Sequence, residues 1–185
     1  MKRGVVLAVV LLAAAGCGKL TKDDAKAMMQ AKFYDKDDNV YCTWTGSQVS
    51  PKGASGTKKL YAFFNADENA SCIDELDVAG IIKKGACTDK RSDGSCFERA
   101  FDLGPNVDIH GIHIRFACGK KKLDDVTSIS TADKKATVKY TRTITRDDAL
   151  AKKVSDCALD GPKSGSEDQS LGFLKDDDGK WSPVE

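Results

Sequence analysis

Seven cysteines are the most chemically versatile residues of this chain, and their spacing limits what they can do. Cysteine thiols form disulfides, bind zinc or act as nucleophiles. The chain contains no C-x₂-C pair, and no cysteine lies within four residues of a histidine, so the spacing does not predict a zinc site. The seven are Cys17, Cys42, Cys72, Cys87, Cys96, Cys118 and Cys157.

The two histidines, His110 and His113, lie on either side of Gly111 and Ile112 in a stretch that predicts a strand. In one strand, residues three apart point to opposite faces. The pair could then bind one metal ion together only if Gly111 formed a bulge. A helix would not give them the i, i+4 spacing of zinc peptidases either. We interpret them as surface or edge histidines.

Other catalytic and ligand-binding patterns are incomplete or missing from the sequence. No G-x-S-x-G, phosphate-binding loop or dinucleotide-binding glycine pattern occurs. Asp35, Asp37 and Asn39 match three calcium ligands of an EF-hand, but Val40 and Gly46 stand where glycine and glutamate are required. We therefore predict no catalytic residue, cofactor or metal ion. The paired carboxylates are expected in caps and turns: Asp23–Asp24, Asp37–Asp38, Asp147–Asp148 and Asp176–Asp178.

The N-terminus has the pattern of an export signal. Lys2 and Arg3 precede an apolar run, residues 5–15, that is too short to span a bilayer but suits a secretory leader. The run ends at Ala14-Ala15-Gly16-Cys17, which resembles the lipobox of bacterial lipoprotein signal peptides, with Ala14 in place of the usual leucine. The resemblance covers these 17 residues and none of the rest of the chain.

The resemblance implies cleavage before Cys17, a diacylglyceryl group on its thiol and an acylated amino terminus. Two or three acyl chains would hold the protein on a membrane, whereas one chain gives only reversible attachment. Gly18 is not the aspartate that retains enteric lipoproteins in the inner membrane, so the resemblance favours the outer membrane. Membrane lipid is then a partner through Cys17, and proteins of the envelope are further candidate partners.

Ordinary secretion, with cleavage after residues 13–15, is the alternative to lipidation. It would leave seven cysteines in the mature chain, one of them unpaired. Lipidation of Cys17 leaves six, an even number that suits disulfides in an oxidising compartment. Even parity therefore favours the lipoprotein interpretation, with residues 1–16 as signal peptide, 17–20 as lipidated anchor and short tether, and 21–185 as one domain.

Six cysteines allow fifteen pairings, and the sequence does not choose among them. Cys87 and Cys96 enclose a polar, turn-rich segment, so we predict a local disulfide between them. Proximity and elimination then give Cys42–Cys72 and Cys118–Cys157.

Three helices are expected. The first covers residues 22–33, with Thr21 as its cap. The second covers residues 72–84, between Ser71 as cap and Gly85 as the residue after its end. The third is short, residues 147–156, capped by Thr145.

Strands are expected over much of the remaining chain. The clearest is residues 136–145, which alternate apolar and polar side chains as a one-sided antiparallel strand does. A loop is expected at residues 161–169, and a solvated turn at Lys120-Lys121-Lys122. The other expected strands are residues 40–45, 59–64, 97–101 and 108–118, and a C-terminal hairpin of 171–175 and 180–184.

The order of these elements predicts an α+β fold, an antiparallel sheet packed against one or two helices of the N-terminal half and stapled by disulfides. This layout weakly resembles cystatin-like and NTF2-like domains. The 185 residues are 41% hydrophobic and 31% charged, which is typical of a globular domain. The net charge of +1 gives no electrostatic basis for binding nucleic acid.

Three functions remain open at this point. The leading hypothesis is a non-catalytic binding or interaction module anchored by lipid in the cell envelope. The second is an envelope hydrolase whose catalytic residues come together only in the folded chain. The third, suggested by the layout alone, is a cystatin-like protease inhibitor.

Overall fold

The computed structural model describes residues 18–46, 48–55 and 58–184. Antiparallel sheets and a few short helices make up this part of the chain, which confirms the α+β class. The strands form two sheets, so the molecule has one sheet more than the sequence predicts. Among the described residues, no helix has both the length and the apolar character needed to cross a bilayer. The expected leader and Cys17 lie outside the described residues.

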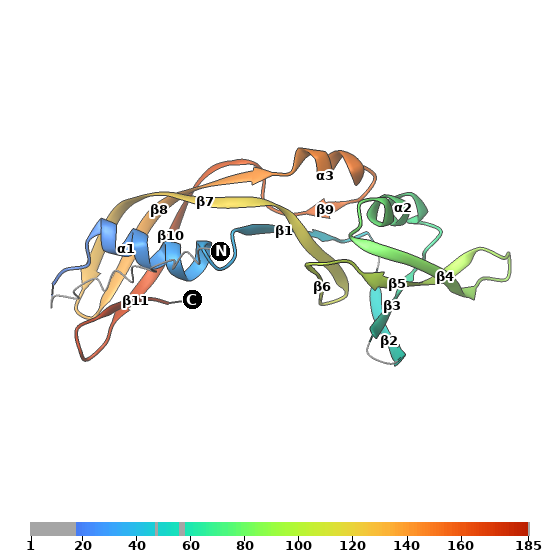
Figure 1. Ribbon diagram of the computed structural model, residues 1–185, viewed down its shortest axis with the longest axis horizontal. Helices are drawn as coiled ribbons and strands as arrows, with labels where there is room; N and C mark the ends of the chain where they lie inside the picture. The colour runs from blue at the N-terminus through green and yellow to red at the C-terminus, as the bar shows by residue number, and fades with distance from the viewer. Residues whose placement is uncertain (1–17, 47, 56–57, 185) are drawn as a thin grey trace, which may run out of the picture.

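The larger sheet is organised around one very long strand, β7 (His113–Ala132), which runs along much of the molecule (Figure 1). Its strand order is β11-β10-β8-β7-β1-β9, and β6 also pairs with β7. The turn between β7 and β8 and the turn between β10 and β11 lie at the same end of the molecule (Figure 1). The other bounds are β1 (Asn39–Trp44), β6 (Val107–His110), β8 (Lys135–Arg146), β9 (Leu159–Asp160), β10 (Gly165–Lys175) and β11 (Trp181–Pro183).

The smaller sheet lies at the opposite end of the molecule from these two turns (Figure 1). Its strand order is β2-β3-β5-β4, all antiparallel. The Val49 amide donates to the Ile112 carbonyl at 2.8 Å, which ties the start of β2 to the tip of the β6–β7 hairpin. Its strands are β2 (Val49–Ser55), β3 (Lys58–Phe64), β4 (Ile82–Lys90) and β5 (Cys96–Leu103).

Helix α1 (Lys22–Met29) begins where its cap predicts. The Thr21 hydroxyl oxygen accepts from the Asp24 amide at 3.2 Å and donates to the Asp24 carboxylate at 2.6 Å. The helix continues as a π-helical turn, η1 (Gln30–Tyr34), where an α-helix to residue 33 is expected. Its apolar face packs on the larger sheet. We call this region the helix half, defined by the buried residues Leu20, Ala25, Met29, Tyr34, Leu123, Val126, Ala136, Val138, Tyr140 and Phe173.

Helix α2 (Ala70–Val78) is shorter than expected, and β4 occupies residues predicted as its last turn. The helix ends at Val78, and Gly80 follows the cap residue with a φ of 73°, the left-handed conformation that glycine adopts easily. The Ile81 amide donates to the Leu76 carbonyl and the Gly80 amide to the Asp77 carbonyl, which is a Schellman motif. The expected stop at Gly85 is therefore wrong. Ser71 is not the cap either, since its hydroxyl donates to the Asp156 carboxylate.

Three further expectations are corrected. Helix α3 (Asp148–Lys153) is capped by Asp147, which accepts from the Leu150 amide at 3.0 Å, and not by Thr145. Strand β10 takes up the second half of the expected loop at 161–169, because it forms a ladder with β8 from Gly165 onward. The lysine run 120–122 lies within β7 instead of a turn, and Lys120 pairs with Asp38 at 2.5 Å.

The second hydrophobic cluster joins the smaller sheet to β1 and α2. The rings of Phe63 and Phe101 stack with centroids 3.9 Å apart, and Trp44 meets Phe63 edge-on at 5.4 Å. We call this region the pocket half. Its buried members include Val40, Cys42, Trp44, Val49, Phe63, Cys72, Ile73, Leu76, Ile82, Cys96, Phe101, Ile114, Phe116, Cys118 and Cys157.

The six described cysteines form three disulfides. Cys87–Cys96 joins neighbouring strands β4 and β5, as predicted. The other two expected pairings are wrong, because the bonds are Cys42–Cys118, between the paired strands β1 and β7, and Cys72–Cys157, between α2 and the segment after α3. These two bonds join residues 76 and 85 positions apart. The pairing of β1 with β7 brings Cys42 and Cys118 together, and the packing of α2 near the end of α3 brings Cys72 and Cys157 together, neither of which elimination could foresee.

Candidate functional site

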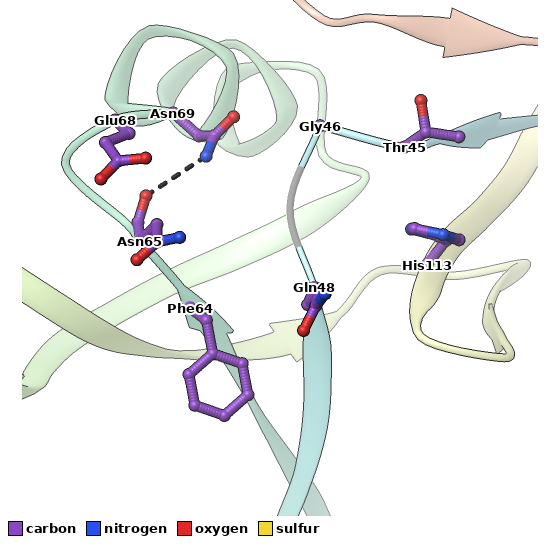
Figure 2. Close-up of a pocket in the computed structure, with 8 residues that line it drawn as sticks. All are labelled: Thr45, Gly46, Gln48, Phe64, Asn65, Glu68, Asn69 and His113. Atoms are coloured by element: carbon purple, nitrogen blue, oxygen red, sulfur yellow. Dashed lines mark hydrogen bonds between the residues drawn. The ribbon is translucent and has the colours of Figure 1, made fainter.

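A polar pocket of about 330 Å³ lies where the end of β1, the end of β3 and the start of β7 meet. Figure 2 shows His113 and Thr45 on one side of it and the side chains from the turn before α2 on the other. Most of its wall consists of hydroxyl, amide, carboxylate and imidazole groups. The lining residues are Thr45, Gly46, Gln48, Phe64, Asn65, Glu68, Asn69 and His113.

Gly46 and Gln48, which lie between β1 and β2, form one wall of this pocket, and the packing beside position 46 requires glycine there. A Cβ atom on Gly46 would lie 2.5 Å from Nε1 of the buried Trp44 ring, too close for any other residue without movement of that ring. Gln48 is fixed by its backbone, since its carbonyl accepts from the Phe64 amide at 3.0 Å. The wall therefore follows from the position of Trp44 in the core.

The turn before α2 forms the opposite wall. Asn65 adopts a positive φ of 50°, a conformation that asparagine tolerates better than most residues. Its carbonyl accepts from the Asn69 side chain at 3.2 Å. The Arg91 guanidinium donates to Asn65 Oδ1 and to Glu68 Oε1, both at 2.9 Å. Arg91, whose guanidinium lies over the Phe97 ring, thus holds this wall in place and balances the charge of Glu68.

His113 enters the pocket because of a hairpin that the sequence analysis did not predict. Gly111 and Ile112 form a two-residue turn between β6 and β7, with Gly111 at a φ of 64°. His110 and His113 therefore face each other across the hairpin, on the same face, and do not point to opposite faces of one strand. Within the described part of the chain, His113 Nδ1 is buried and has no hydrogen-bond partner.

The unpartnered Nδ1 bears on what the pocket can do. A buried polar atom without a hydrogen bond costs about 1–3 kcal/mol. A catalytic histidine of the serine-hydrolase type instead has its Nδ1 bonded to a carboxylate that orients the ring. Glu68, the carboxylate of this pocket, is paired with Arg91. The arrangement suits binding of a small polar molecule better than general base catalysis.

The six cysteines expected to form disulfides lie outside this pocket. The six described ones cross-link the framework around the pocket without lining it, and Cys17 is outside the described residues. The partial calcium pattern forms a turn, in which Asp37 accepts from the Asn39 amide at 3.0 Å and from the Tyr41 hydroxyl at 3.1 Å. No group of three or more metal-binding side chains is found in the described ranges.

Sequence reasoning missed most of the pocket. Gln48, Asn65, Glu68 and Asn69 belong to connections between elements, and no local motif marks them. One signal was available: a Gly-X pair between two strand-like stretches predicts a tight hairpin, and it would have placed His110 and His113 opposite each other.

Comparison with known proteins finds no matching family model, no matching curated protein and no matching solved structure.

Proposed function

We propose that this chain is a lipid-anchored lipoprotein of the bacterial cell envelope, and that its folded part is a non-catalytic binding module. The observation that supports lipid anchoring is the pairing of the cysteines. All six described cysteines are in disulfides, which leaves Cys17 as the only other cysteine of the chain. Disulfides form and persist in oxidising compartments, the destination of a chain with an export signal. Cys17, at the end of the lipobox-like motif, is the residue that carries the lipid.

The pocket supports the proposal that the folded part is a binding module. It presents two asparagines, one glutamine and one threonine, with Glu68 neutralised by Arg91. Such a wall suits a small, uncharged molecule rich in hydrogen-bonding groups, such as an N-acetylated sugar. The His113 ring lines the same pocket and would contact this ligand. Disulfides nearby keep the wall rigid, which lowers the entropy cost of binding.

Lipidation is tested by expressing the full chain in a Gram-negative host with radiolabelled palmitate. The wild type is expected to incorporate the label and to fractionate with the outer membrane, whereas Cys17→Ala incorporates none. The double variant Cys87→Ser/Cys96→Ser is the matched control, since it loses two other thiols and should keep the label. Intact mass before and after reduction should show acyl chains and three disulfides. Recovery of an acyl-free polypeptide that retains residues 1–16 would contradict the proposal.

Binding is tested by NMR, because the chain has only two histidines. The variants His110→Gln and His113→Gln assign the two ring signals. Titration with di-N-acetylchitobiose, and with glucose as a sugar that lacks the amide, is expected to shift the His113 signal more strongly for the N-acetylated sugar. Asn69→Ala should weaken that response. An unchanged His113 signal for both sugars would contradict the sugar as ligand, and hydrolysis of the disaccharide would favour the envelope-hydrolase alternative instead.

A further inference from the structure

The first described residues of the chain are packed against the folded body. Leu20 is only 6% exposed and belongs to the core of the helix half. The Trp181 indole Nε1 donates to the Gly18 carbonyl at 3.4 Å. Residues 18–20, which belong to the short tether expected at residues 17–20, are therefore held against the folded body.

Chain length then limits how far Cys17 can lie from the body. An extended chain spans at most about 3.3–3.6 Å per residue, so Cys17 lies within about 11 Å of the Leu20 backbone. Each interfacial region of a bilayer is only about 5–8 Å thick outside the hydrocarbon core. Acyl chains on Cys17 must enter that core, so the residues around Gly18 and Leu20 are brought to the level of the lipid headgroups.

We propose that the protein docks directly on the lipid surface through one defined end. This proposal rests on the lipidation of Cys17 proposed above. The docking surface, which we call the anchor end, consists of residues 18–20, the β7–β8 turn, the β10–β11 turn and Trp181. Contacts between these segments make one surface of them: Lys134 pairs with Asp177 at 2.5 Å, and the Lys175 amide donates to the Lys134 carbonyl at 2.8 Å.

The side chains of the anchor end fit a lipid headgroup layer. Trp181 is partly exposed, and the Lys175 ammonium lies 5.6 Å from its ring centroid. Tryptophan is enriched at the membrane interface because its ring is apolar and its N–H is polar. Lysines alternate here with aspartates, as in the Lys134–Asp177 pair, so the surface has no strong net charge. Docking therefore depends on the acyl chains and on neutral headgroups, and anionic lipid is not required.

Docking in this way fixes where the pocket lies. The smaller sheet and α2 are at the far end of an elongated molecule, away from the anchor end (Figure 1). His113 and the pocket belong to that far part. The long strand β7 acts as a rigid spacer between them. The pocket is thereby held away from the bilayer and open to soluble ligands.

The two tryptophans allow a direct test, since Trp181 lies at the anchor end and Trp44 in the pocket half. The acylated full chain is reconstituted in phosphatidylcholine vesicles that contain lipid spin-labelled near the headgroup. Wild-type fluorescence is expected to be quenched, and Trp181→Phe, which leaves only Trp44, is expected to lose at least half of that quenching. Trp44→Phe should keep the quenching. Because Trp44 is buried in the core, that variant can also disturb the fold, so the decisive comparison is between the wild type and Trp181→Phe.

A linker variant separates direct docking from mere attachment. Insertion of about twelve glycine and serine residues between Gly18 and Lys19 adds roughly 20 Å of flexible reach. This variant should stay on the vesicles but lose the quenching of Trp181. Equal quenching of wild type and Trp181→Phe, or quenching unchanged by the linker, would overturn the docking proposal.

Failure of lipidation would be distinguished by mass. If the chain carries no acyl group, a maleimide-headgroup lipid is coupled to the Cys17 thiol, since the other six cysteines are in disulfides. The same quenching comparison then decides the docking geometry, while the missing acyl group contradicts only the proposed function.

Discussion

The helix half and the pocket half bury similar apolar side chains but are cross-linked in different ways. The buried cluster of the helix half contains no cysteine, whereas Cys42, Cys72, Cys96, Cys118 and Cys157 all belong to the cluster of the pocket half. The helix half consists of a capped helix on the hairpin-connected strands β7 and β8, with β10 alongside. The pocket half joins short strands and α2 from segments far apart in the chain.

The difference shows which part of the molecule depends on disulfide cross-links. Hairpin partners such as β7 and β8 lose little entropy on pairing, whereas segments 76 or 85 residues apart lose more. Helix α1 is also far in sequence from the strands that it covers, but it is held by packing without a disulfide. A disulfide removes part of that loss from the unfolded chain. The pocket half, which projects from the proposed membrane surface and supplies the rigid pocket wall, is where this stabilisation is concentrated.

The largest effect is expected from removing the Cys72–Cys157 bond. The double variant Cys72→Ser/Cys157→Ser should lower the free energy of unfolding by about 4–5 kcal/mol, because the bond closes a loop of 85 residues. Denaturant unfolding measures the loss. Cys87→Ser/Cys96→Ser, which opens a loop of only 9 residues, is the matched comparison and should lose about 2–3 kcal/mol. Equal losses would break the loop-length argument.

The helix half should respond to packing instead. Met29 is fully buried there, and Met29→Ala should cost about 3 kcal/mol by leaving a cavity. Hydrogen exchange should show the greatest loss of protection in α1 and β10, with less change in α2 and β5. Val78→Ala, at a side chain that is 79% exposed, is the control and should change stability little. Uniform loss of protection across both halves would contradict their separate stabilisation.

Helix capping gives a smaller contrast between the halves. Thr21→Ala removes the bond to the Asp24 amide and should cost about 1 kcal/mol in thermal or denaturant unfolding. Ser71→Ala in α2 should cost less, about 0.5 kcal/mol or below, because Ser71 does not cap its helix. The reverse order would mean that the assigned N-terminus of α2 is wrong.

The smallest effect is confined to alkaline pH. Burial, and next the neighbouring Tyr140, raise the pKa of Tyr34 to about 12. Below pH 10, Tyr34 is neutral in both the folded and the unfolded chain, so its contribution to the free energy of unfolding is fully present there. Between pH 10 and about 12 the unfolded chain ionises first, and stability falls as the pH rises. Unfolding of wild type and Tyr34→Phe across this range should show a steeper fall for the wild type; parallel curves would contradict the shift.

The sequence by itself determined the features that depend on neighbouring residues. The cap at Thr21, the disulfide Cys87–Cys96 and the strand expected at residues 136–145 could all be predicted, because the groups that stabilise them lie within a few positions of one another or repeat with a fixed period.

Only the tertiary structure decided which distant segments meet. Cys42 bonds to Cys118 because β1 pairs with β7, and residues 165–169 form a strand because β8 offers an open edge. The pocket combines residues of the β1–β2 and β3–α2 connections with His113 at the start of β7, and the only local signal in the sequence is the hairpin turn before His113. The physical reason is the same in each case. Pairing and burial between remote segments are chosen by the energy of the whole fold, which no short window of residues contains.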